Sequence, residues 1–141
     1  MLHRIQLTAI ALSLGFVSTQ VDADVVAVVG ADSPISSLTR VEVMDIFLGR
    51  RTRFPDGSAA FPIDQSEGSA ARDEFYTTYA AMSAAQIKAF WSKIIFTGRG
   101  QPPKAVANGE EAKKLVAANL NAITYIDRTK VDSSVRIVLA P

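Results

Sequence analysis

The sequence predicts an α/β fold with a mostly parallel central sheet that is flanked by helices. Short β-branched runs alternate along the chain with segments in which apolar residues recur every three or four positions. Strands that are separated by helices usually pair in parallel, because the crossover helix returns the chain to the end of the sheet where the first strand began. The length of 141 residues, of which 48% are hydrophobic, is sufficient for a substantial core.

The first half of the chain is predicted to form two strands and two helices. The strands are expected at residues 25–29 and 59–63, and the helices over residues 39–48 and from Gly68-Ser69 onward. The first strand is continuously apolar, as in a strand that is covered on both faces. Thr39 and Glu42 have the spacing of a capping box, and Gly49 is suited to end the helix that they begin.

The second half is predicted to add two helices and two strands. The helices are expected to begin at Ser83 and Asn108, and the strands at residues 122–126 and 135–139. Ser83 and Gln86 form a second capping box, and Asn108 is a good N-cap. Residues 96–103 contain two glycines and two prolines, which predicts irregular structure between the helices.

The first 23 residues have the features of a secretory signal peptide. Two basic residues near the start precede an apolar run, Leu7–Val17, and Val21-Asp22-Ala23 fits the positions that a signal peptidase reads. We expect cleavage after Ala23, which would leave residues 24–141 as a single soluble periplasmic domain. The apolar run is short for a membrane span, and a retained amphipathic anchor is the alternative. The absence of cysteine excludes lipid attachment at the processed end.

The charge balance and the residue types argue against nucleic-acid binding and against catalysis. There are 15 Lys and Arg against 14 Asp and Glu, so the chain lacks the basic excess of a nucleic-acid binder. The only histidine is His3, inside the predicted signal peptide, which leaves no imidazole base for a serine nucleophile. The sequence also lacks the spacing of residues that bind a metal. We therefore expect no catalytic residue, no cofactor and no metal site.

The segment Ile63–Arg72 is the strongest candidate for a binding site. It has the pattern of a strand end, a Ser/Gly turn and the first turn of a helix. A helix N-terminus presents unpaired backbone amides and the positive end of the helix dipole, which together suit a phosphate, sulfate or carboxylate. An ordinary helix cap without a ligand is the alternative. The predicted ligand-binding residues here are Gln65, Ser66, Gly68, Ser69 and Ala70.

Two further residues are candidate ligands. Ser33 follows the first strand, and open α/β sheets bind ligands at the carboxyl ends of their strands. Arg99 lies in residues 97–101, where a backbone nest beneath a guanidinium would suit an anion. A helix-initiating serine and an ordinary interhelical loop are the respective alternatives. The cationic residues Arg50, Arg51 and Arg53 would steer anions, dock a partner or form a solvated loop.

Three segments resemble phosphate-type periplasmic substrate-binding proteins of ABC importers. Residues 45–51, Asp-Ile-Phe-Leu-Gly-Arg-Arg, are similar to a helix end in that family, residues 62–75 to its anion-binding strand, turn and helix, and residues 122–126 to one of its strands. The resemblance covers most of residues 25–139. It implies a periplasmic-binding-protein-like lobe with a small helical extension, which binds inorganic phosphate or a similar oxyanion and feeds the membrane subunits of an importer.

The chain departs from the family pattern in its motif and in its length. The family turn reads Arg-x-x-x-Ser-Gly-Thr, and here Gln65 replaces the arginine, Ser69 is kept, and Ala70 and Ala71 replace the glycine and threonine. Loss of the arginine removes a charge-assisted fork, and Arg72 is expected to point elsewhere. There is room for one lobe only. Whether two chains pair as a homodimer to rebuild a cleft stays open, and an interaction or sensor module without tight anion binding is the alternative function.

Overall fold

The computed structural model describes residue 15 and residues 24–141. The predicted signal peptide therefore lies outside the described residues, apart from Gly15. The strands are β1 (Val25–Gly30), β2 (Phe61–Gln65), β3 (Lys104–Val106), β4 (Ala122–Asp127) and β5 (Val135–Leu139). The helices are α1 (Arg40–Phe47), α2 (Ala70–Ala80), α3 (Ala84–Phe96), α4 (Gly109–Ala118) and the short 3₁₀ helix η1 (Arg128–Lys130). None of the helices in this part of the chain has the length and apolar character that a membrane span requires.

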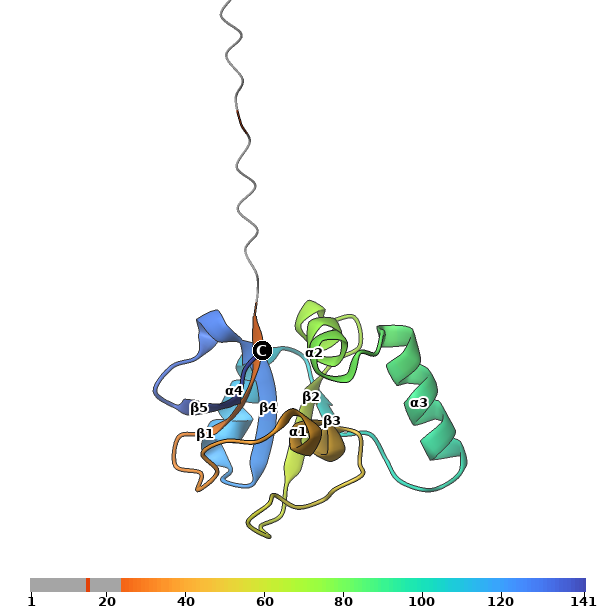
Figure 1. Cartoon of the computed structure of the whole chain (residues 1–141), viewed down its shortest axis with the longest axis horizontal. Helices are drawn as coiled ribbons and strands as arrows, with labels where there is room; N and C mark the ends of the chain where they lie inside the picture. The colour runs from red at the N-terminus through yellow and green to blue at the C-terminus, as the bar shows by residue number, and fades with distance from the viewer. Residues whose placement is uncertain (1–14, 16–23) are drawn as a thin grey trace, which may run out of the picture.

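The five strands form one sheet in the order β3-β2-β4-β1-β5 (Figure 1). The α/β class is confirmed, but the sheet is mixed rather than mostly parallel. β2 pairs in parallel with β3 and β4, whereas β1 lies between β4 and β5 and is antiparallel to both. The expectation failed at β1 because the strand that follows it in the sequence is not its neighbour in the sheet.

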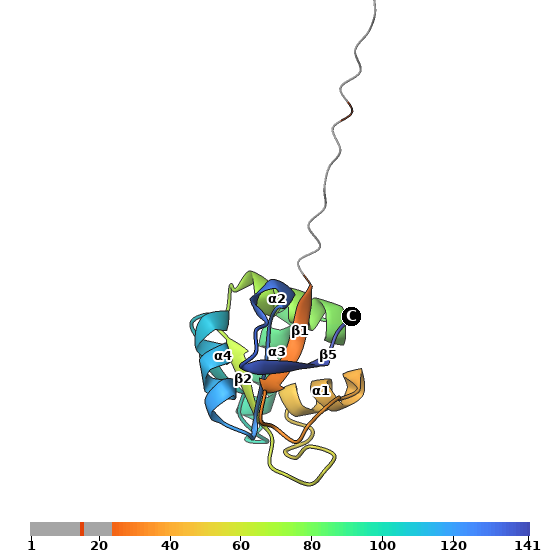
Figure 2. The same cartoon turned by 90° about the vertical axis from the view of Figure 1, so that its left-hand side faces the viewer.

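Both faces of the sheet are covered by helices, with a hydrophobic cluster on each. α1 and α2 cover one face, where Phe47, Phe75 and Tyr125 are fully buried. α4 covers the other face through Ala112 and Val116. Figure 2 shows α4 on one side of β1 and α1 on the other. All six residues of β1 are buried, and the first five, Val25–Val29, contribute alternately to the two clusters, which explains the continuous apolar run that predicted this strand.

The predicted helix starts are confirmed by their hydrogen bonds. In the first capping box, Thr39 Oγ1 accepts from the Glu42 amide and Glu42 Oε1 accepts from the Thr39 amide, each at 3.2 Å. Ser83 and Gln86 exchange the same pair of bonds. Helix α3, which Ser83 begins, lies beside the sheet at the end of α2 (Figure 1), as the resemblance implied for a small helical extension.

Two strand assignments differ from the sequence-based expectation. β2 begins and ends two residues later than the expected 59–63, and it includes Asp64 and Gln65 because their buried polar side chains find hydrogen-bond partners inside the protein. β3 was not predicted at all. It is three residues long, its first two residues are exposed, and it follows two prolines, so only its pairing with β2 defines it as a strand.

Candidate anion-binding site

The turn between β2 and α2 has the geometry that the sequence predicts. Gly68 adopts a φ of 91°, a left-handed conformation that glycine reaches without steric cost. The Ser69 amide donates to the Ser66 carbonyl at 3.1 Å, which closes the turn. Ser69 is the N-cap of α2, and its hydroxyl oxygen accepts from the Arg72 amide at 3.3 Å. The turn therefore places the first amides of α2 at the carboxyl end of β2.

The side chains predicted to donate to an anion are already bonded within the protein. The Ser66 hydroxyl donates to the Val106 carbonyl at 3.1 Å, and the Ser69 hydroxyl donates to Gln65 Oε1 at 3.1 Å. Gln65 is 3% exposed, and its amide nitrogen donates to the Tyr125 carbonyl at 3.0 Å. These three side chains hold the turn in place.

The backbone amides of Ala70 and Ala71 remain as donors. Within residues 24–141, the structure gives neither amide a hydrogen-bond partner, as expected for the first turn of a helix. Ala70 is exposed and has a small side chain. The site that remains is a helix N-terminus with two amides, without hydroxyl donors.

A buried carboxylate that sequence analysis missed lies directly behind this turn. Asp64 is 3% exposed and accepts hydrogen bonds from the Tyr125 hydroxyl, from the Tyr76 hydroxyl at 2.7 Å and from the Gln65 amide at 2.8 Å. The partners belong to β4, to α2 and to β2 itself. An aspartate next to an apolar strand residue was the available signal, but its partners are 12 and 61 residues away.

Arg72 supplies the positive charge that balances Asp64. Its Nε lies 3.5 Å from Asp64 Oδ1, and its guanidinium carbon lies 5.6 Å from the centre of the Tyr76 ring. The Arg72 side chain is 13% exposed, and its buried Nε has no hydrogen-bond partner among the described residues. The guanidinium thus folds back toward the end of β2 instead of pointing away from the turn. A cation therefore lies beside Asp64, the residue that precedes Gln65.

All three tyrosines of the sequence lie in this aromatic region and have raised pKa values. Burial, followed by the negative charge of Asp64, raises the pKa of Tyr76 and of Tyr125 well above the ordinary value of 10.0. Burial raises the pKa of Tyr79 to about 12, and the Tyr79 hydroxyl donates to the Val25 carbonyl at 2.7 Å. Since the sequence has no other tyrosine, tyrosinate absorbance reports on this region alone.

We expect the native protein to show almost no tyrosinate absorbance at pH values where the urea-unfolded chain titrates, near the ordinary pKa of 10.0. Because each folded-state pKa is raised, folding stability is complete below the unfolded pKa and falls as the pH rises from about 10 toward 12. Ultraviolet titration of native and unfolded protein, with parallel denaturation curves, measures both effects. Native titration near pH 10 would contradict the buried hydrogen-bonded arrangement.

The structure does not bring Ser33 or Arg99 to this site. Ser33 follows β1, which runs antiparallel to β4 and therefore opposite to β2, so it lies at the other end of the sheet. Ser33 is 3% exposed, and its hydroxyl oxygen accepts from the Ile35 amide. Arg99 is exposed and lies in the segment that enters β3. Because β3 is parallel to β2, this segment is also at the N-terminal end of β2.

No protein-family model and no curated protein sequence matches the chain. Solved structures do match its fold. A Clostridium perfringens protein, described as a phosphate ABC transporter substrate-binding protein with bound phosphate, aligns with a TM-score of 0.62 and 24% identity over 82% of this chain and 44% of its own. An ABC-type phosphate transport receptor from Vibrio cholerae aligns with a TM-score of 0.63 and 20% identity, over 82% of this chain and 45% of its own. PstS from Borrelia burgdorferi aligns with a TM-score of 0.54 and 16% identity, over 82% of this chain and 46% of its own.

These similarities identify the fold. The solved structures are of binding proteins and transport receptors, and at these identities the likeness extends to the architecture alone. The chain covers most of its own length in each alignment but less than half of the partner structure. The chain therefore has the fold of the phosphate-type substrate-binding proteins, over a length that corresponds to less than half of such a protein.

Proposed function

We propose that the protein is a periplasmic solute-binding protein that holds a small oxyanion, with phosphate as the first candidate, and presents it to an ABC importer. The observation that carries this proposal is the pair of free amides, Ala70 and Ala71, at the start of the 11-residue helix α2. The helix dipole and the amides both favour negative charge at that point. A structure with the same fold contains bound phosphate, which supports phosphate as the ligand.

The charges around the turn predict weak binding. Asp64 is paired with Arg72, and Glu67 lies 3.6 Å from the ammonium of Lys88, whereas Asp73, in the first turn of α2, has no ion-pair partner among the described residues. An anion at Ala70 therefore meets no excess of positive charge and is held by two amides and the helix dipole. Such a site lacks the arginine–phosphate fork that gives charge-assisted pairs their strength, so its affinity is expected to be lower than that of the family motif.

Replacing Ala70 by proline tests the site without disrupting the helix. Ala70 is the first helical residue, where proline is well tolerated, and Ser69 before it has a φ of −63° and a ψ of 128°, which suits a residue preceding proline. The variant removes one donor to the anion, and loss of one hydrogen bond to a charged group corresponds to about a tenfold fall in affinity. Isothermal titration with phosphate and with sulfate measures the change.

The matched control is Ala84→Pro. Ala84 is the first residue of α3, is exposed and follows the N-cap Ser83, so the same substitution is made in the same context at a different helix. We expect unchanged phosphate affinity in Ala84→Pro and an unchanged melting temperature, within a few degrees, in both variants. Equal affinity of wild type and Ala70→Pro would remove Ala70 from the site, and flat heats for the wild type at millimolar phosphate and sulfate would refute oxyanion binding.

A non-transporting interaction or sensor module is the second candidate. It is favoured by the internal hydrogen bonds of Ser66 and Ser69, which leave no hydroxyl for a ligand. The exposed cationic loop would then be the contact surface, since Arg50, Arg51 and Arg53 are all exposed and, among the residues that the structure describes, only Arg50 faces a carboxylate, Asp45, at 3.8 Å. Charge reversal of the three arginines to glutamate should abolish capture of a periplasmic partner, and unchanged capture would count against this function.

A further inference from the structure

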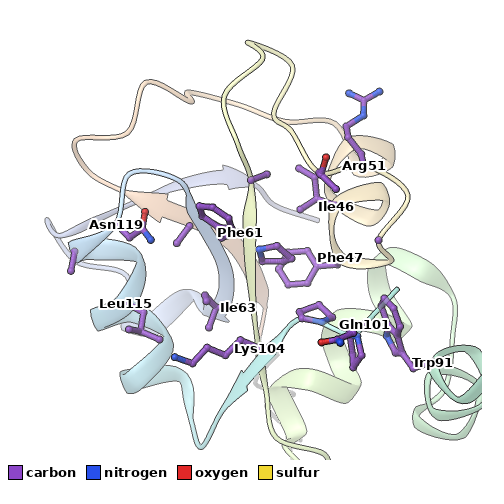
Figure 3. Close-up of a pocket in the computed structure, with 18 residues that line it drawn as sticks. Ile46, Phe47, Arg51, Phe61, Ile63, Trp91, Gln101, Lys104, Leu115 and Asn119 are labelled. Atoms are coloured by element: carbon purple, nitrogen blue, oxygen red, sulfur yellow. The ribbon is translucent and has the colours of Figure 1, made fainter. Parts of the chain in front are cut away.

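A cleft of about 570 Å³ opens beside the first residues of β2 (Figure 3). Its walls come from the C-terminal parts of α1 and α4, from β2, and from residues 101–104 that lead into β3. Most of the large side chains along it are apolar: Ile46, Phe47, Phe61, Ile63, Trp91 and Leu115. The volume falls within the roughly 300–1,000 Å³ that is typical of small-molecule sites, which also combine apolar walls with few polar groups.

The cleft is separate from the proposed oxyanion site. β2 runs from Phe61, which lines the cleft, to Gln65, which precedes the turn at α2. None of the residues of the β2–α2 turn lines the cleft. The two features therefore lie at opposite ends of the same strand, and a ligand in one would not contact a ligand in the other.

The charged residues that line the cleft are both positive. They are Lys104 and Arg51, and within residues 24–141 no carboxylate side chain lines the cleft. In Figure 3 the Lys104 side chain extends across the cleft toward α4, with its ammonium near Leu115, whereas Arg51 points away at the outer rim. The C-terminal ends of α1 and α4 contribute about half a negative charge each, but these partial charges are spread over the last carbonyls of each helix, whereas the full charge of Lys104 lies on one ammonium that extends into the cleft. An anionic group is therefore the complement of the Lys104 ammonium.

The aromatic residues of the cleft indicate a largely apolar partner. Phe61 is 52% exposed, although it lies in a strand of the central sheet, so a large aromatic surface is available to a ligand. Trp91 forms part of the wall beside Gly49 and is 6% exposed. It is the only tryptophan of the sequence, so its emission reports occupancy of this wall.

We propose that this cleft binds a small monocarboxylate with an aromatic or aliphatic body. The carboxylate pairs with the Lys104 ammonium, and the apolar body covers Phe61, Ile63 and Leu115. Inorganic phosphate does not fit this description, because it has no apolar surface to bury against these walls.

Titration with 4-phenylbutyrate, followed by calorimetry and by Trp91 emission, tests the proposal. We expect saturable binding that phosphate does not displace, and binding of the neutral analogue 4-phenylbutanamide that is about three- to fivefold weaker, as befits a partly exposed ion pair. Lys104→Met should reduce the affinity for the acid to that for the amide. Lys114→Met, an exposed lysine on α4 outside the cleft, is the matched control and should leave both affinities unchanged.

A second variant tests the location of the site without altering a charge. Ala118 lines the cleft and is exposed on the last turn of α4, so Ala118→Phe should fill the cleft and abolish binding while the melting temperature stays near that of the wild type. No heat and no change in emission for either compound would overturn the site, and equal affinity for acid and amide would overturn the role of Lys104. Ala70→Pro should leave 4-phenylbutyrate binding intact, which separates this site from the oxyanion site.

Discussion

Replacement of Asp64 by asparagine is expected to lower the free energy of unfolding by about 3 kcal/mol, a large part of the stability of a domain of this size. Asp64 is 3% exposed and accepts hydrogen bonds from two tyrosine hydroxyls and a backbone amide. An asparagine offers one acceptor oxygen and turns an N–H group toward a donor. It also leaves the largely buried guanidinium of Arg72 without a counter-charge.

Urea denaturation followed by circular dichroism measures this loss, and Asp45→Asn is its control. Asp45 makes an ion pair with the exposed Arg50 at 3.8 Å, so the same substitution there should change stability by less than about 1 kcal/mol. Tyr76→Phe removes one of the donors to Asp64 and should cost about 1 kcal/mol. If Asp64→Asn unfolded at the same urea concentration as Asp45→Asn, the buried cluster around Asp64 would contribute little to folding stability.

The Asp64 cluster also positions the candidate oxyanion site. Tyr125 comes from β4, Tyr76 from α2 and Asp64 from β2, so their hydrogen bonds join the three elements at one point. The next residue, Gln65, bonds to Ser69 at the helix cap. The start of α2 is thereby fixed over the end of β2, and loss of Asp64 should disturb the Ala70 amide as well as the core.

Local features of the fold were predictable from the sequence. The capping boxes at Thr39 and Ser83 depend on residues three positions apart, so the pattern contains all the partners. The turn at Gly68 and Ser69 is equally local, and the structure has it where the motif predicts it. The same holds for β1, whose burial on both faces requires only that every residue be apolar or small.

Features that depend on distant partners were not predictable. β3 exists because Lys104–Val106 pairs with Ile63–Gln65, a pairing that no local pattern contains. The antiparallel direction of β1 is set by β4 and β5, and it moves Ser33 to the end of the sheet opposite the turn. Strand order therefore decides which candidate residues meet.

The hydrogen bonds of the candidate site were also not predictable, because they too depend on distant residues. The sequence correctly indicates hydroxyls at the helix start, but the acceptors that engage them are Val106 for Ser66 and Gln65 for Ser69. Gln65 is in turn held by the Tyr125 carbonyl, 60 residues away. Whether a hydroxyl is free for a ligand is decided by such distant partners, and this is why the proposed site is reduced to backbone amides.

Replacement of Gly30 by alanine is expected to destabilise the protein by about 2–3 kcal/mol. Gly30 is the last residue of β1, and a Cβ there would lie 2.5 Å from the carbonyl oxygen of Val116 in α4. The obstacle is backbone, which cannot rotate aside, so α4 must move away from the sheet. That movement would open the contact of Val116, which is 0% exposed, with the hydrophobic cluster on this face.

Gly109→Ala is the control for the Gly30 substitution, because it separates the clash at Gly30 from the general effect of replacing a glycine by alanine. A Cβ at Gly109 would meet its nearest neighbour, Ile126 Cγ2, at 3.6 Å, an ordinary contact, and alanine favours the helix that begins there, so stability should stay equal or rise. Because α4 carries Leu115 and Ala118 of the cleft, Gly30→Ala should also weaken 4-phenylbutyrate binding. Phosphate binding depends on α2, on the opposite face of the sheet, so Gly30→Ala should retain it below the melting temperature. If Gly30→Ala lost both phosphate and 4-phenylbutyrate binding, the two faces would not respond independently.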